Sequence, residues 1–183
     1  PRPLTASDFR IQAPSTESTV DVCVIQMVTD LVTAEKTAAV PVHDGEIPIS
    51  RDQDLLKITA VDRAGTPGEL FTGFIRGFGL MTGALASSAA WDTSDIIVVG
   101  ADESDMALAV NRIAELQGGA VFCDAGKVVR ELPLPLFGLL SQASLEDLAD
   151  GVKGINEAAR ARGVPFPDPL LSLVALTGAA IPY

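Results

Sequence analysis

The sequence has few of the residues that usually bind a catalytic metal, because its 183 residues include one histidine and two cysteines. Zinc and iron hydrolase sites usually take two or more imidazoles from the chain, and here only His43 is available. Cys23 and Cys123 lie far apart, without CxxC or CxH spacing, each in an apolar, strand-like run. We therefore predict two buried free thiols, as in a reducing cytoplasm, rather than a disulfide or a ligand pair, and no metal site in this sequence.

Basic residues are also scarce: 13 Lys and Arg against 24 Asp and Glu give a formal net charge of −11. Nucleic-acid binding needs clustered basic side chains, so this charge argues against a nucleic-acid partner. No segment reaches the roughly 18 to 20 unbroken apolar residues of a membrane helix. The opening PRPLTASDFR lacks the regions of a signal peptide. We expect a cytoplasmic protein with no membrane partner and, since it begins at Pro1, a piece cut from a longer chain or a processed one.

Hydrophobic residues (48%) and charged residues (20%) are present in the proportions of a globular domain. We predict an α+β fold with a mixed or antiparallel sheet and two main helices, over about 102–117 and 144–162. The chain is divided into a linker or edge segment over 1–18 and one domain over 19–183.

The two helices are predicted from caps and apolar stripes. Asp102 is a typical N-cap residue, and Ser144 opens a segment that resembles a capping box with Asp in place of Glu or Gln. The first stripe is Met106, Ala109, Val110, Ile113 and Ala114. The second stripe is Leu145, Leu148, Ala149, Val152, Ile155 and Ala159. Gly151 and Gly154 cost the second helix about 1 kcal/mol each relative to Ala and allow close packing against a neighbour.

Strands are predicted from β-favouring runs between turn signals. They cover residues 20–28, 38–42, 46–50, 55–61, 70–75, 84–90, 96–99, 120–123 and 127–132. Residues 96–132 therefore form a predicted β-α-β-β unit. Residues 43–45 and 63–68 are expected as a turn and a loop, and 91–95 as a hairpin loop. The apolar tail, 168–183, is expected to dock in this core or on a missing domain.

Three glycines, Gly77, Gly79 and Gly83, lie close together and indicate a backbone that needs positive φ or close approach. A phosphate-binding loop would be followed by Gly-Lys-Ser/Thr, which is not found here, so we predict a tight turn between strands.

A family resemblance covers most of the chain and is specific from Gly77 to Pro135, which reads GFGLMTGALASSAAWDTSDIIVVGADESDMALAVNRIAELQGGAVFCDAGKVVRELPLP. This stretch resembles the C-terminal domain of bacterial adenine deaminases, in the amidohydrolase superfamily. The family has a similar Gly-Phe-Gly-Leu turn, Ala-Ser-Ser hairpin arm, Ile-Val-Val-Gly strand and Leu-Pro-Leu-Pro segment. Weaker similarity extends to residues 55–58 and 156–169.

The resemblance implies hydrolytic deamination of adenine to hypoxanthine and ammonia by a water activated on divalent Mn or Fe. In that family the metal ligands lie in an N-terminal barrel. A barrel of this kind needs about 250 residues, so it is not contained in this sequence. The resemblance thus implies that this chain alone is inactive. Its expected partners are that barrel, adenine and, in a homo-oligomer, further copies of the chain.

One loop departs from the family. Where the family reads Ala-His-Asp-Ser-His-Asn, residues 90–95 read Ala-Trp-Asp-Thr-Ser-Asp, so Trp91 and Ser94 replace both histidines. If this loop reaches the active site, Trp91 offers a flat apolar face to a purine and Asp92 accepts a hydrogen bond from an exocyclic amine. Ser88 is the third substrate-side candidate. The structural alternative is that Trp91 packs and Asp92 caps a turn.

Other functional interpretations stay open. The lost histidines favour a non-catalytic structural or interaction domain of a diverged amidohydrolase that acts on another base or a cyclic amide. A stand-alone ligand binder is a third possibility. His43 beside Asp44 is either an acid/base pair or, as we prefer, a turn histidine in solvent. The carboxylates at 102, 103 and 105 are interpreted as cap and helix-dipole partners.

Overall fold

The computed structural model describes residues 2–14, 18–63, 69–93 and 95–178. In these ranges the strands are β1 (Ile11–Gln12), β2 (Thr19–Met27), β3 (Thr33–Pro41), β4 (Glu46–Ile47), β5 (Leu55–Val61), β6 (Leu70–Arg76), β7 (Ala84–Ser87), β8 (Ile96–Gly100), β9 (Gly119–Asp124) and β10 (Lys127–Pro133). The helices are the 3₁₀-helices η1 (Ala6–Phe9) and η2 (Arg51–Gln53) and the α-helices α1 (Glu103–Glu115), α2 (Leu145–Arg160) and α3 (Pro169–Ala175). None of the described helices has the length and apolar character needed to cross a membrane.

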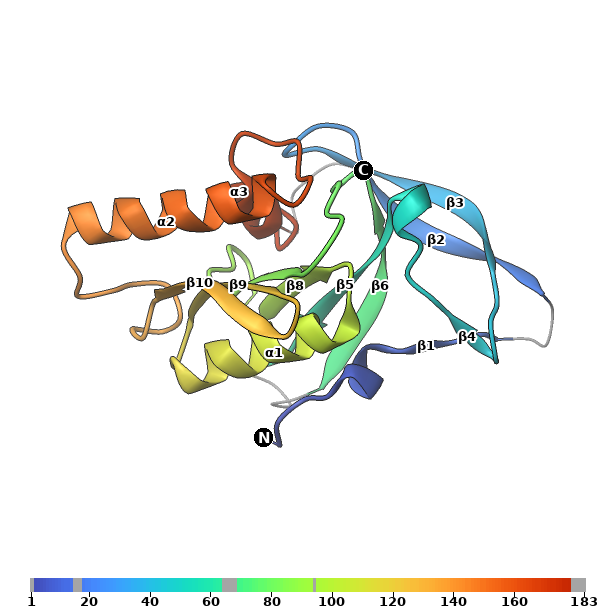
Figure 1. The fold of residues 1–183 in the computed structure, drawn as a ribbon, viewed down its shortest axis with the longest axis horizontal. Coiled ribbons are helices and arrows are strands. Elements are labelled where there is room, and N and C mark those ends of the chain that lie inside the picture. The colour runs from blue at the N-terminus through green and yellow to red at the C-terminus, as the bar shows by residue number, and fades with distance from the viewer. Residues whose placement is uncertain (1, 15–17, 64–68, 94, 179–183) are drawn as a thin grey trace.

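The large sheet has eight strands in the order β10-β9-β7-β8-β5-β6-β2-β3 (Figure 1). Neighbouring strands are antiparallel except β2 and β6, which pair in parallel, so the sheet is mixed. A separate two-stranded sheet pairs β1 with β4. The predicted α+β fold with a mixed sheet and two main helices is therefore confirmed, and α3 is a third, shorter helix.

The predicted β-α-β-β unit is confirmed as β8, α1, β9 and β10. Strand β7 lies between β8 and β9 and is antiparallel to both, so β8 and β9 run parallel to each other. Parallel strands need a crossover connection, and α1 provides it. The Asp102 side chain caps this helix by accepting the N–H groups of Ser104 and Asp105.

The described residues form three hydrophobic clusters, the third of them between β2, β3 and neighbouring strands. At β8 the other two lie on opposite faces of the sheet, because alternate residues of a strand point to opposite sides. In β8, Ile96 and Val98 pack in the cluster that contains α1. Ile97 and Val99 pack in the other cluster, with Ile155 of α2 and residues of α3. The central strands are therefore buried on both faces, between α1 and the pair α2 and α3.

The second helix forms as predicted, but its apolar stripe is buried over only half its length. Ser144 caps α2 by accepting the Asp147 N–H. Ile155 and Ala159 are fully buried, whereas Leu145 is 83% exposed. The stripe is buried only toward its C-terminal end because α2 packs on the edge strand β10 and its N-terminal end extends beyond that strand (Figure 1).

The close packing predicted for the two glycines of α2 is confirmed. A Cβ at Gly151 would lie 2.7 Å from Leu132 Cδ1, and a Cβ at Gly154 would lie 3.3 Å from Arg130 Cδ. Both neighbours belong to β10. The glycines therefore let the helix backbone approach the edge of the sheet.

The two cysteines are free, but only one is buried. Cys123 lies in β9 inside the α1 core, as predicted. Cys23 is exposed, so the expectation of two buried thiols is wrong. In β2 the side chain of the next residue, Val24, points into a core, and Cys23 therefore points to the opposite face, where the end of α3 lies nearby without burying the thiol.

Several strand boundaries differ from the predictions. Strand β3 begins at Thr33 rather than Ala38, and β4 ends at Ile47 rather than residue 50. Strand β7 ends at Ser87, so the hairpin loop begins at Ser88 instead of residue 91. Residues 64–68 of the predicted loop over 63–68 lie outside the described residues. Boundaries depend on pairing partners, which a local pattern does not contain.

The glycine-rich turn before β7 is confirmed. Gly77, Gly79 and Gly83 all have positive φ. The Asp54 carboxylate accepts the N–H groups of Gly77 at 2.7 Å and Gly79 at 3.0 Å. These two N–H groups therefore bond to the protein's own carboxylate.

The two end segments both pack on the domain. Leu4 and Phe9 are buried in the α1 core, and the Asn111 amide exchanges two 2.8 Å hydrogen bonds with the Leu4 backbone. The division of the chain at residue 18 stays a prediction. At the other end α3 docks in the core of this chain, which is the first of the two alternatives for the tail. Residues 179–183 lie outside the described residues.

Candidate functional site

The β7–β8 loop, residues 88–95, contains the three predicted substrate-side residues. Trp91 is 57% exposed, and its backbone N–H donates to Thr177 Oγ1 at 2.9 Å, just beyond α3. Asp92 is also exposed. Ser94, the second position where the family has histidine, lies outside the described residues. The indole is therefore presented at the surface on a backbone that is fixed by the end of α3.

Ser88 is in a different environment from Trp91. It is fully buried, and its hydroxyl donates to the Gly138 carbonyl at 2.8 Å while accepting the Gly119 N–H at 2.8 Å. The hydroxyl therefore fastens the start of the β7–β8 loop to β9 and to the loop that precedes α2. A direct contact between Ser88 and a substrate stays a prediction, and the side chain is fully buried, with its one proton donated to Gly138.

The segment before α2 presents apolar side chains to solvent. We call residues 134–145 the apolar loop. Its exposed side chains are Leu136 (38%), Phe137 (86%), Leu139 (48%), Leu140 (61%) and Leu145 (83%). Sequence reasoning missed this surface, and the signal for it is that residues 132–145 contain no charged residue.

The carboxylates around the start of α1 have structural partners, and Asp102 is the cap that was predicted. Asp102 caps the helix, and Glu103 accepts a 2.9 Å hydrogen bond from the buried Lys57 ammonium. Asp105 is buried and accepts the N–H groups of residues 125 and 126 in the β9–β10 turn. Burial raises the pKa of Asp105, and the hydrogen bond from Gly126 partly opposes that rise. Glu103 and Asp105 therefore join α1 to β5 and to the β9–β10 turn.

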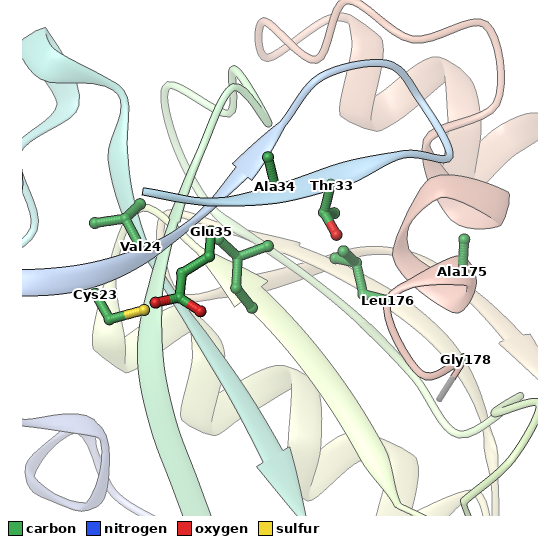
Figure 2. A pocket seen from close by; sticks show the side chains of 9 residues that line it. Cys23, Val24, Thr33, Ala34, Glu35, Ala175, Leu176 and Gly178 are labelled. Carbon is green, nitrogen blue, oxygen red and sulfur yellow. The ribbon is translucent and has the colours of Figure 1, made fainter. Parts of the chain in front are cut away.

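A cavity of about 310 Å³ lies between the β2–β3 pair and the end of α3, and Figure 2 shows Cys23 and Glu35 side by side in it. Desolvation and then the charge of Glu35 raise the pKa of the Cys23 thiol. A thiol with a raised pKa is a poor nucleophile at neutral pH, so this geometry does not activate Cys23.

The described part of the chain contains no group of three or more His, Cys, Asp or Glu side chains that could hold a metal ion. His43 is exposed in the turn between β3 and β4, where its backbone N–H and carbonyl pair with Glu46 at 2.9 Å. This agrees with a turn histidine in solvent. The described residues therefore offer no ligand set for the divalent metal, which the family resemblance assigns to the N-terminal barrel.

Comparisons with known proteins agree on one family. Residues 30–183 match the family model described as the adenine deaminase C-terminal domain. An adenine deaminase of Methylobacterium nodulans is 38% identical over 181 residues, which are 99% of this chain and 32% of that relative. An adenine deaminase of Moorella thermoacetica is 36% identical over 181 residues, 98% of this chain and 30% of that relative. The chain thus spans about a third of the length of the curated relatives that it matches.

Proposed function

The chain belongs to the family of adenine deaminase C-terminal domains, and on this premise we propose that it is one domain of a larger hydrolase that acts on adenine. In the proposed reaction the oxygen of water replaces the exocyclic amino group at the purine carbon, giving hypoxanthine and ammonia. The observation that carries the proposal is the family match over residues 30–183, with relatives named adenine deaminase at 38% and 40% identity.

The hydrolytic centre is assigned to a part of the protein outside this chain. Divalent Mn or Fe would lower the pKa of a water molecule and so supply the nucleophile. We assign its ligands to an N-terminal amidohydrolase barrel of the same polypeptide, because the described residues of this chain offer no such group of ligands. We expect this chain alone to be inactive, and the full protein to be a cytoplasmic, homo-oligomeric enzyme of adenine catabolism.

Within this chain, the β7–β8 loop is the proposed substrate-side element. The exposed indole of Trp91 provides a flat apolar surface on which a purine can stack. Asp92 would accept a hydrogen bond from the exocyclic amine. Ser88 would act through the loop, since its buried hydroxyl ties the loop to Gly119 and Gly138.

The test is to incubate the full-length protein with adenine and Mn²⁺ or Fe²⁺ and to follow the ultraviolet absorbance. Conversion to hypoxanthine is expected, and its absence would defeat the assignment. Trp91→Ala and Asp92→Asn should raise KM if the loop contacts the substrate. Phe71→Ala is a matched control, because Phe71 is 78% exposed and lies on β6. Unchanged turnover with lowered stability in the loop variants would indicate a structural role.

A second candidate is a diverged amidohydrolase that uses this chain as a structural domain and acts on another base or a cyclic amide. It is favoured by Trp91, which stands where the resembled family has a histidine. A panel of purines, pyrimidines and cyclic amides separates the two. Turnover of another compound without turnover of adenine would select the second candidate.

A further inference from the structure

The apolar loop and the groove that runs along α2 from Leu145 form one exposed surface, most of whose side chains are apolar. Phe137 and Leu145 are among the most exposed side chains of the described residues, at 86% and 83%. From Leu145 the surface continues along α2 as a shallow groove of about 540 Å³. The groove is lined by Leu145, Leu148, Ala149, Val152, Lys153, Asn156, Arg160 and Pro167. Contiguous exposed apolar surface of this kind marks an interaction site.

The composition of the apolar loop is that of an interface core. Charged residues make up 20% of the chain, yet none occurs over residues 132–145. Depletion of charge with enrichment of large apolar side chains distinguishes the buried centre of an interface from ordinary surface. A solvated loop of this length would be expected to contain charged side chains.

The apolar loop is also held in one conformation. Leu134 N–H donates to the Gly118 carbonyl at 3.0 Å, and Leu136 and Leu140 exchange two backbone hydrogen bonds at 3.1 Å. The buried Ser88 hydroxyl donates to the Gly138 carbonyl. The backbone of the loop is thus bonded to itself and to the domain, while its apolar side chains are exposed. A surface built in this way needs little ordering on binding.

We propose that this surface is where the domain docks on the N-terminal region of its own full-length protein. The proposal rests on the proposed function, in which that region is the catalytic barrel. The relatives are about three times as long as this chain, since it covers 32% of one and 30% of another, so a large partner region is available in the same polypeptide. A second copy is disfavoured as the occupant because two chains of net charge −11 repel each other.

The first test is hydroxyl-radical footprinting of the isolated chain and of the full-length protein, read by mass spectrometry. Docking should lower the oxidation of Phe137, Leu140 and Leu145 several-fold in the full-length protein. Phe71, exposed on β6, should oxidise equally in both and serves as the internal control. Equal oxidation of the apolar loop in both proteins would overturn the proposal.

The second test introduces charge at the centre of the surface with Phe137→Asp. The φ of Phe137 is +59°, a conformation that Asp adopts more readily than Phe, so the isolated variant should keep its melting temperature. In the full-length protein the same variant should restore oxidation at Leu140 and Leu145, whereas Phe71→Asp should not.

Self-association is measured by sedimentation of the isolated chain. If the isolated chain forms a dimer and Phe137→Asp makes it a monomer, the proposal is overturned, because the surface then binds a second copy of the chain. Neither readout depends on turnover. If the apolar loop is protected from oxidation in the full-length protein but no hypoxanthine is formed, only the proposed function is overturned. If hypoxanthine is formed but the apolar loop is not protected, only the docking surface is overturned.

Discussion

The helices α1 and α2 begin in the same way and are covered differently. Each starts at a side chain that accepts backbone N–H groups, Asp102 for α1 and Ser144 for α2. Helix α1 crosses the central strands and buries its stripe from Met106 to Ile113. Helix α2 lies on the edge strand β10 and leaves Leu145 in solvent. An apolar stripe therefore indicates that a helix has a partner surface, but it does not say whether that surface is in the same domain.

The largest effect should come from the stripe of α1. Ile113→Ala removes a side chain that is 1% exposed and should lower the free energy of unfolding by about 2–5 kcal/mol, because lost transfer energy and a cavity add. Leu145→Ala, at 83% exposure, should change it by less than about 0.5 kcal/mol. Urea denaturation of the 183-residue chain measures both. Similar losses of stability in the two variants would show that the two stripes are buried alike.

A smaller loss of stability is expected at Asp105, the buried carboxylate that joins α1 to the β9–β10 turn. The two carboxylate oxygens of Asp105 each accept a backbone N–H group, from Ala125 and Gly126. Asparagine has only one acceptor oxygen, so in Asp105→Asn one of these N–H groups would face the NH₂ group of the side chain. Asp105→Asn should therefore cost about 1–3 kcal/mol, measured by urea denaturation at neutral pH.

The Asp105→Asn variant also tests how the contribution of Asp105 to the stability of the fold depends on pH. Burial raises the pKa of Asp105 above its ordinary value of 3.8, so the folded state binds the proton more tightly than the unfolded state. The contribution of Asp105 to stability should fall as pH rises from 3.8 through the raised pKa. The stability difference between wild type and Asp105→Asn should decline over that range, and an increase would contradict the assignment of burial as the cause.

The two glycines of α2 test how closely this helix packs on β10. Gly154→Ala should stabilise the chain by up to about 1 kcal/mol, because the helix gains propensity and the side chain of Arg130 can move aside. Gly151→Ala places a Cβ against Leu132, where overpacking of about 1–3 kcal/mol outweighs that gain. In thermal unfolding, the melting temperature of Gly154→Ala should lie above that of the wild type and that of Gly151→Ala below it. The reverse order would mean that α2 does not pack on β10 through Gly151.

The smallest effect is expected at the ion pair that joins α1 to β10. Arg112 binds Glu131 with hydrogen bonds of 2.7 and 3.0 Å, and this lowers the pKa of Glu131 from its ordinary value of 4.5. Both side chains are partly exposed, so Glu131→Gln should cost less than about 1 kcal/mol. The contribution is present above pH 4.5 and should be lost as pH falls through the lowered pKa, the opposite sign to Asp105. Stability measured against pH in both variants checks this contrast.

Much of the fold could be predicted because its signals are local. The caps at Asp102 and Ser144, the turn at Gly77–Gly83 and the strand over 55–61 each depend on residues close together in sequence. The exposure of Cys23 could not be predicted, because it depends on which helices cover the far end of the sheet.

The candidate site was only partly accessible to sequence reasoning. The family resemblance identified the loop of Trp91 and Asp92, and the structure places the indole at the surface. The bonds of Ser88 to Gly119 and Gly138 join segments that are 31 and 50 residues apart, so a local pattern does not contain them. The charge-free run over 132–145 was present in the sequence, but only the exposed side chains gave it meaning.

The helices, most strands and the family of this protein could be predicted without the structure, because helix caps, apolar periodicity, turn residues and family motifs are properties of neighbouring residues. The tertiary structure alone decided that β7 lies between β8 and β9, that α2 extends past the edge of the sheet, and that the apolar loop faces outward. These features depend on strand pairing and on packing between distant segments. The same amphipathic pattern is compatible with burial inside the domain or against a neighbouring one.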